Sequence, residues 1–193
     1  MNNYIQIYKN VISDEYCDEL IEKFESKPEH HSDDDFGQGV YENKNQDHTS
    51  YKVINLEKCK MIDDITKLTK VYFKYIEQYK KDCDIESNMW PTKFNFEQFR
   101  LKRYLPNDKD QFTPHVDVNN HEYARRFLVL FIYLSDNEKG ETAFPQMGVA
   151  SPCKKGSLIM FPPLWPWLHA GLKPINTPKY MTGSYLHYRK NNE

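Results

Sequence analysis

The stretch FLVLFIYL, residues 127–134, is the longest apolar run in the chain. Its eight residues are too few for a transmembrane helix, which needs roughly 20. A short apolar run with aromatic and β-branched residues is typical of a strand that is buried on both faces. We therefore expect residues 127–134 to form the central strand of a sheet.

Several other short strands are expected in the second half of the chain. Residues 94–96 alternate apolar and polar, and residues 99–104 continue with a phase shift that indicates a bulge. Residues 157–161 are a short apolar strand that ends at two prolines, and residues 180–188 resemble a last strand. Turn-forming residues separate these segments.

The first half of the chain contains two helical patterns. Ser13 is a plausible N-cap for a first helix, which Pro28 ends. A second helix is expected at about residues 61–81, where apolar residues recur at helical spacing: Ile62, Ile65, Leu68, Tyr72, Ile76 and Tyr79. Residues 30–50 are polar and read as a long loop, which suits a lid or binding loop over a site or else a disordered segment.

Helices first and short strands later predict an α+β chain with a β-sandwich or barrel. A length of 193 residues suits one domain. Lys and Arg total 26 and Asp and Glu total 28, so the chain lacks the basic excess of a nucleic-acid-binding protein. We expect a cytoplasmic protein with no nucleic-acid or membrane partner. The four cysteines stand far apart in the sequence, so we expect them to be reduced. The oligomeric state is left open.

The sequence His115-Val116-Asp117 and the distant His169 carry the chemistry. Residues i and i+2 of a strand point to the same face, so His115 and Asp117 can bind one ion together. A histidine from a neighbouring strand completes a set of two imidazoles and one carboxylate. This set describes the facial triad of non-haem Fe(II) oxygenases, which keeps positions open for cosubstrate and O2.

Each of these residues also has a simpler interpretation. His115 and Asp117 suit a solvated strand end, and His169 beside tryptophans suits packing. A second His-x-Asp, at residues 31–33, is discounted because its loop offers no rigid frame. Lys179 is either exposed or, if it points inward, requires an anion such as the carboxylate of 2-oxoglutarate.

Taken in order, eight short segments resemble the prolyl 4-hydroxylase branch of the Fe(II)/2-oxoglutarate-dependent dioxygenases. They are residues 11–21, Arg103-Tyr104, His115-Val116-Asp117, Ile132-Tyr133-Leu134, residues 140–145, residues 155–161, His169-Ala170-Gly171 and Lys179-Tyr180. The resemblance covers nearly the whole chain. It implies one domain over residues 1–193, a double-stranded β-helix (jelly roll) with N-terminal supporting helices. The helical support would span about residues 11–82 and the β-helix core about residues 94–188.

The resemblance also implies roles for individual residues. His115, Asp117 and His169 would bind Fe(II), and Lys179 would pair with the distal carboxylate of 2-oxoglutarate. The remaining cosubstrate contacts would come from Tyr104, Thr142 and Tyr133, although Tyr133 is equally suited to the core. On the substrate side the candidates are Arg126, Phe112, Tyr185 and Trp167. Arg126 has an alternative interpretation as a solvated residue at a strand end. We expect Trp165 and Trp167 either to line the mouth of the site or to pack on the sheet.

Some residues depart from the family pattern. Phe112 replaces a tyrosine, Tyr185 replaces a tryptophan and Lys139 replaces a glycine, while residues 104–115 form a longer stretch without the usual glycines. These departures put the substrate in doubt and leave the iron and cosubstrate groups intact.

The resemblance implies hydroxylation of a prolyl residue in a peptide or protein, with release of succinate and CO2. Fe(II) would be the cofactor, 2-oxoglutarate and O2 the cosubstrates, and ascorbate a stimulant. Two alternatives stay open: the same chemistry on a free amino acid or other small molecule, and a non-catalytic jelly-roll binding module. Repair of nucleic acid is disfavoured by the lack of basic charge. Halogenation is disfavoured because Asp117 occupies the position that a halide would need.

Overall fold

The computed structural model describes residues 4–32 and 50–189 of the chain. Most of the polar segment for which a lid is one interpretation, and Asp33 of the second His-x-Asp, lie outside these residues. The lid therefore stays a prediction.

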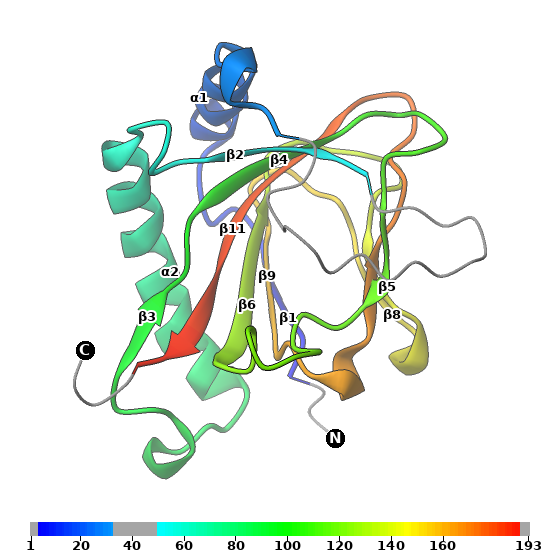
Figure 1. Ribbon diagram of the computed structural model, residues 1–193. Helices are drawn as coiled ribbons and strands as arrows, with labels where there is room; N and C mark the ends of the chain where they lie inside the picture. The colour runs from blue at the N-terminus through cyan, green and yellow to red at the C-terminus, as the bar shows by residue number, and fades with distance from the viewer. Residues whose placement is uncertain (1–3, 33–49, 190–193) are drawn as a thin grey trace.

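Two antiparallel sheets form the body of the protein (Figure 1). The seven-stranded sheet has the order β1-β9-β6-β11-β4-β2, and β3 also pairs with β11. Its strands are β1 (Gln6–Tyr8), β2 (Lys52–Asn55), β3 (Phe94–Phe96), β4 (Arg100–Tyr104), β6 (Arg126–Tyr133), β9 (Leu158–Phe161) and β11 (Lys179–Tyr188). The four-stranded sheet has the order β5-β10-β7-β8, with β5 (Phe112–His115), β7 (Thr142–Phe144), β8 (Val149–Ser151) and β10 (His169–Gly171). This arrangement confirms the α+β jelly-roll fold.

Strand β6 is central, as predicted, because it lies between β9 and β11. Its side chains alternate between two buried clusters. Leu128, Leu130 and Ile132 face the helices, whereas Val129 and Tyr133 face the small sheet. The period of two residues explains why the strand is apolar throughout: each face meets a different core.

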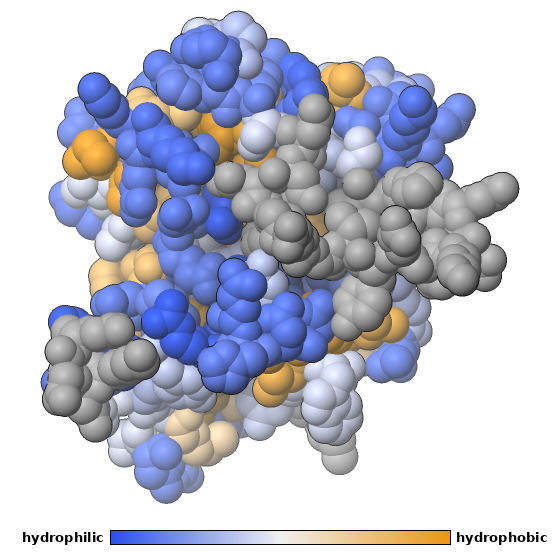
Figure 2. Space-filling model, in the orientation of Figure 1, coloured by the Kyte–Doolittle hydropathy of each residue, from blue (hydrophilic) through white to orange (hydrophobic). Residues whose placement is uncertain are grey.

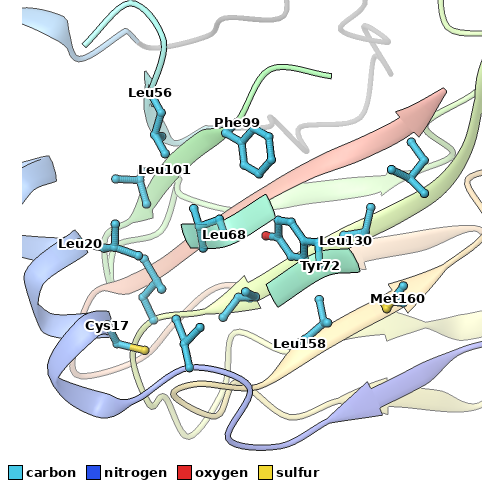
Figure 3. Packing of buried hydrophobic residues seen from close by; sticks show 14 of the residues in the cluster. Cys17, Leu20, Leu56, Leu68, Tyr72, Phe99, Leu101, Leu130, Leu158 and Met160 are labelled. Atoms are coloured by element: carbon cyan, nitrogen blue, oxygen red, sulfur yellow. The ribbon is translucent and has the colours of Figure 1, made fainter. Parts of the chain in front are cut away.

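Two helices cover the outer face of the large sheet, on the side opposite to β5 and β8 (Figure 1). Helix α1 (Asp14–Glu25) begins after Ser13, whose hydroxyl accepts a hydrogen bond from the backbone N–H of Tyr16 at 3.2 Å. Helix α2 (Ile62–Asp82) is the longer one. Figure 3 shows Leu20 of α1 and Leu68 and Tyr72 of α2 gathered with sheet residues such as Leu130. In the described part of the chain, four short 3-10 helices complete the elements: Pro28–His30, Ser87–Met89, Pro145–Met147 and Trp165–Trp167.

The structure corrects one position of the predicted apolar stripe on α2. Ile62 is 58% exposed, whereas Asp64 is buried. The Asp64 carboxylate accepts hydrogen bonds from Lys23 at 2.9 Å and from the Tyr16 hydroxyl at 3.1 Å, so α1 neutralises the charge that α2 buries. A buried carboxylate with such partners is tolerated, and it ties the two helices together.

Other differences concern short strands. β1 and β2 belong to the large sheet, although β2 lies within residues 11–82, which we expected to form helical support. Residues 94–104 form two strands, β3 and β4, separated by Glu97–Phe99. Strands of three or four residues are too short to show a clear alternation in the sequence.

The described surface is largely polar. In the orientation of Figure 2, hydrophilic side chains cover most of the visible described surface, and hydrophobic residues appear as separate patches. All four cysteines are free and buried. Neither helix is long and apolar enough to cross a membrane.

Gly183 of β11 is essential to the packing of the large sheet. A Cβ atom at this position would lie 2.2 Å from Cδ1 of Phe131 and 2.5 Å from the carbonyl oxygen of Leu130. We expect Gly183→Ala to lower the free energy of unfolding by about 2 kcal/mol or more, since backbone as well as side chain must move. Urea denaturation measures this.

Gly148→Ala is the control for the Gly183 variant, because a Cβ at Gly148 meets nothing within 4 Å. Its only cost is the positive φ of 62°, about 1 kcal/mol. Equal losses in the two variants would contradict the packing argument.

Candidate metal and cosubstrate site

Three candidate metal ligands gather where the small sheet faces the large one. His115 ends β5, His169 begins β10, and the two residues are direct partners across these strands. Asp117 lies two residues beyond the end of β5, so the expected strand geometry holds for His115 only. One possible ligand atom from each of the three residues lies within 4.8 Å of the others. Within residues 4–32 and 50–189, this is the group of histidine, cysteine and acidic residues that has the geometry to hold a metal ion.

The backbone fixes the tautomer of both imidazoles. Nδ1 of His115 lies 2.8 Å from the carbonyl oxygen of Thr113, and Nδ1 of His169 lies 3.0 Å from that of Trp167. A carbonyl oxygen only accepts hydrogen bonds, so each Nδ1 carries the proton and donates it. Nε2 of both rings is then left with a lone pair, which is the form that binds a metal.

The carboxylate of Asp117 is buried and oriented by Tyr185. The Tyr185 hydroxyl donates a 2.7 Å hydrogen bond to Oδ1, and Oδ2 lies 3.4 Å from Nε2 of His169. Oδ2 has no hydrogen-bond donor among the described residues. Burial alone would raise the pKa of Asp117, but His169, His115 and the Tyr185 hydroxyl outweigh it and hold the pKa well below its usual range. A buried carboxylate whose two oxygens face two imidazole lone pairs fits a cation.

Lys179 is fully buried, which decides between the two interpretations of this residue. Its ammonium group donates a 2.9 Å hydrogen bond to the carbonyl of Gly140 and lies 4.5 Å from the ring centroid of Tyr104. A Cβ on Gly171 would lie 3.6 Å from Nζ, so the glycine leaves the ammonium open on that side. Burial lowers the pKa of Lys179 to about 8. An ammonium group in this position can bind the carboxylate of a ligand.

One cavity joins the two imidazoles to Lys179. Tyr104 and Thr142 line it, as expected of cosubstrate contacts. Tyr133 does not line it: its hydroxyl lies 2.7 Å from Oγ1 of Thr142 and accepts the backbone N–H of Thr142 at 3.0 Å. Tyr133 therefore belongs to the core and orients Thr142.

Of the candidate substrate residues, Phe112 and Tyr185 line the cavity, whereas Arg126 and Trp167 do not. Arg126 is buried, forms two 2.8 Å hydrogen bonds with the carboxylate of Glu97 and lies 4.1 Å from the ring centroids of Tyr123 and Tyr185, so it is not a solvated strand end. Phe112 lines the cavity and stacks on His115 with a centroid distance of 3.9 Å.

The tryptophans lie outside the cavity lining. Trp167 is half-buried and packs edge-on against Tyr4, and Trp165 is 77% exposed. For Trp167 the packing interpretation is the better one.

Sequence reasoning missed two cations of the cavity. Arg100 and Lys102 line it together with Tyr104, from alternate positions of β4. Counting back by two from Tyr104 along the expected strand would have found both residues.

Comparisons with known proteins agree with this geometry. Residues 99–187 match the family described as the 2OG-Fe(II) oxygenase superfamily. No curated protein sequence matches the chain.

Several solved structures share the fold. The 2OG complex of a viral collagen prolyl hydroxylase from Paramecium bursaria Chlorella virus-1 is 22% identical, with a TM-score of 0.68 over 97% of this chain and 98% of that one. A Pseudomonas putida prolyl-4-hydroxylase is 13% identical, with a TM-score of 0.65 over 97% and 94%. A Trichoplax adhaerens prolyl hydroxylase in complex with a hypoxia-inducible-factor peptide fragment is 14% identical, with a TM-score of 0.67 over 96% and 84%.

The family match spans β4 to β11, and so contains all three candidate metal ligands and Lys179. The chain has the fold of these prolyl hydroxylases, and its residues 99–187 match the 2OG-Fe(II) oxygenase superfamily.

Proposed function

We propose that the protein hydroxylates a prolyl residue in a peptide or protein, with His115, Asp117 and His169 as the Fe(II) ligands and Lys179 as the partner of the distal carboxylate of 2-oxoglutarate. The observation that carries this proposal is the shared cavity, in which a buried ammonium group and two imidazoles with free lone pairs face the same space. Bound Fe(II) and 2-oxoglutarate would supply, with O2, an oxidising power that no side chain has, and 2-oxoglutarate would leave as succinate and CO2.

The chain's own residues would bind the metal ion, orient the cosubstrate and exclude water from the site. The carbonyls of Thr113 and Trp167 hold the imidazoles in the metal-binding tautomer. Tyr104 and Thr142 line the cavity beside Lys179 and offer hydroxyl groups to 2-oxoglutarate. Phe112 and Phe131 form apolar walls that keep water from the reacting centre.

The prolyl substrate is supported by the fold shared with prolyl hydroxylases and by the buried Arg126 beside Asp117. Nη1 of Arg126 donates to the backbone carbonyl of Asp117 at 3.3 Å, so this arginine borders the metal site. Stimulation by ascorbate and a cytoplasmic location stay predictions.

Succinate formation under air with Fe(II), 2-oxoglutarate and a proline-rich peptide tests the proposal. We expect the peptide to stimulate succinate release and to gain the mass of one oxygen atom. Asp117→Ala and His115→Ala should abolish turnover and the joint stabilisation by Mn(II) and 2-oxoglutarate in thermal unfolding.

His121→Ala is the control for the ligand variants, because His121 is exposed and lies outside the cavity lining. Full turnover in either ligand variant would refute the iron assignment. Succinate release that ignores the peptide would refute the peptide substrate alone.

Tyr185 is expected to act as a positioning residue for Asp117. Tyr185→Phe removes the 2.7 Å hydrogen bond and keeps the ring, so the carboxylate gains freedom to rotate away from the metal. We expect the affinity for Mn(II) to fall by about 10- to 100-fold, measured by titration without turnover. Tyr188→Phe, on the exposed end of the same strand, should leave it unchanged; equal affinities of the Tyr185 variant and the wild type would contradict the role.

Binding of 2-oxoglutarate should weaken at high pH. The pKa of Lys179 is about 8 in the free protein, and the carboxylate binds the protonated ammonium. Above about pH 8 the free protein must first take up a proton, so the apparent Kd of the Mn(II)-loaded protein should rise toward roughly tenfold per pH unit. Calorimetric titration between pH 7 and pH 9.5 measures this dependence.

Lys179→Arg is the matched control, since a guanidinium stays protonated throughout this range. The apparent Kd of this variant for 2-oxoglutarate should not rise with pH as it does in the wild type. An equal slope in both proteins would assign the pH dependence to another group.

A further inference from the structure

Lys179 is held in the cavity by a loop that joins the two sheets. Residues 134–141 connect β6 of the large sheet with β7 of the small one. In the described part of the chain, the ammonium group of Lys179 donates its hydrogen bond to the carbonyl of Gly140 in this loop, at 2.9 Å. The position of that carbonyl therefore decides where the ammonium group points.

Gly140 also contacts the stem of the same lysine. Its φ is +74°, and a Cβ at this position would lie 3.0 Å from Cδ of Lys179. The same Cβ would lie 3.6 Å from Oδ1 of Asn137 and 3.6 Å from Cα of Pro174. Gly140 is thus enclosed between the lysine, Asn137 and the loop of residues 172–178, which connects β10 with β11.

The side chain of Asn137 ties these two loops together. It is buried, and its amide nitrogen donates to the carbonyl of Ile175 at 3.0 Å and to the carbonyl and hydroxyl of Thr177 at 2.8 and 3.2 Å. Its amide oxygen accepts the backbone N–H of Lys139 at 3.1 Å and that of Ile175 at 3.0 Å. An asparagine side chain has two N–H donors and two acceptor positions, so these bonds use its whole capacity.

The bonds of Asn137 act on Lys179 through the backbone. The bond to the N–H of Lys139 closes a turn directly before Gly140. The bonds to residues 175 and 177 hold this turn against the segment that leads into Lys179. Asn137 thereby fixes the carbonyl of Gly140 relative to the lysine that binds it.

The strand that carries Lys179 has a second anchor, at Ser135. The Ser135 hydroxyl donates to the carbonyl of Pro178 at 3.3 Å and accepts the backbone N–H of Tyr180 at 3.0 Å. The backbone on both sides of Lys179 therefore stays attached when Asn137 is changed. Removal of the asparagine side chain should then move the carbonyl that Lys179 binds, while the backbone of the lysine keeps its place.

We propose that Asn137 is a positioning residue for the cosubstrate: it holds the carbonyl of Gly140 in place, and that carbonyl aims the ammonium group of Lys179 at the distal carboxylate of 2-oxoglutarate. The inference rests on the proposed function and adds to it a residue that lies outside the cavity lining. Because Asn137 acts through Gly140 and Lys179, its effect is confined to recognition of the distal carboxylate.

Binding of two keto acids to the Mn(II)-loaded protein without O2, measured by calorimetric titration, tests this role. 2-Oxoglutarate and 2-oxobutanoate present the same keto acid to the metal, and only 2-oxoglutarate has a distal carboxylate for Lys179. We expect the wild type to bind 2-oxoglutarate about tenfold or more tightly, because a charge-assisted hydrogen bond in a buried site is strong. In Asn137→Ala this ratio should fall several-fold through a higher Kd for 2-oxoglutarate, whereas the Kd for 2-oxobutanoate should stay the same.

Asn137→Ser is the milder variant, and it carries the test if the alanine variant fails to fold. A serine hydroxyl can still accept the N–H of Lys139 but is too short to reach Thr177, so the ratio should again fall, by less than in the alanine variant. Asn120→Ala is the matched control, since Asn120 is an exposed loop asparagine that accepts the backbone N–H of Tyr123 at 3.2 Å and lies outside the cavity lining. Its ratio should equal that of the wild type.

A wild-type ratio in the folded Asn137 variants would overturn the role of this residue. Equal rises of both Kd values would also overturn it, because a general disturbance of the site would then explain the loss. Failure of the proposed function gives a different result: the wild-type protein itself would bind both keto acids equally or would bind neither, and the inference would fall with it.

Discussion

The pairing of β5 with β10 is the constraint on which the site depends, because it sets His115 directly opposite His169. A slip of one residue would turn one of the imidazoles to the other face of the sheet. The same segments supply the carbonyls of Thr113 and Trp167 that select the tautomer of each ring. The register of β5 and β10 and the tautomers of the two imidazoles are thus fixed by the same segments. A metal ion would meet ligands that need little rearrangement.

The two sheets contribute different parts of the chemistry. The small sheet carries both histidines and Thr142, whereas the large sheet carries Lys179 on β11 and the inward face of β4. Their relative position rests on the buried cluster between them, in which Phe144 of β7 meets Phe161 of β9. The helices on the outer face keep the large sheet dry on its other side. Fold stability and site geometry therefore depend on the same packing.

The sequence was most informative where one residue decides the outcome. His115, Asp117, His169 and Lys179 were identified from their order in the chain, and the structure brings them to one cavity or its edge. Contacts between distant segments had no such signal: Tyr185 and Asp117 stand 68 positions apart. Local patterns failed for physical reasons too, since the apolar Ile62 lies outside the core and the charged Asp64 inside it, where Lys23 supplies the opposite charge.

Tyr185 shows how a departure from the family pattern on the substrate side reaches the metal site. Its hydroxyl binds Asp117, its ring lies 4.1 Å from the guanidinium carbon of Arg126 and packs edge-on against Phe131. A residue that contacts both a candidate metal ligand and the walls of the cavity couples the two, because moving the ring also moves the hydrogen bond to the carboxylate. A change of substrate in this chain is therefore restricted to changes that leave the ring and the hydroxyl of Tyr185 in place.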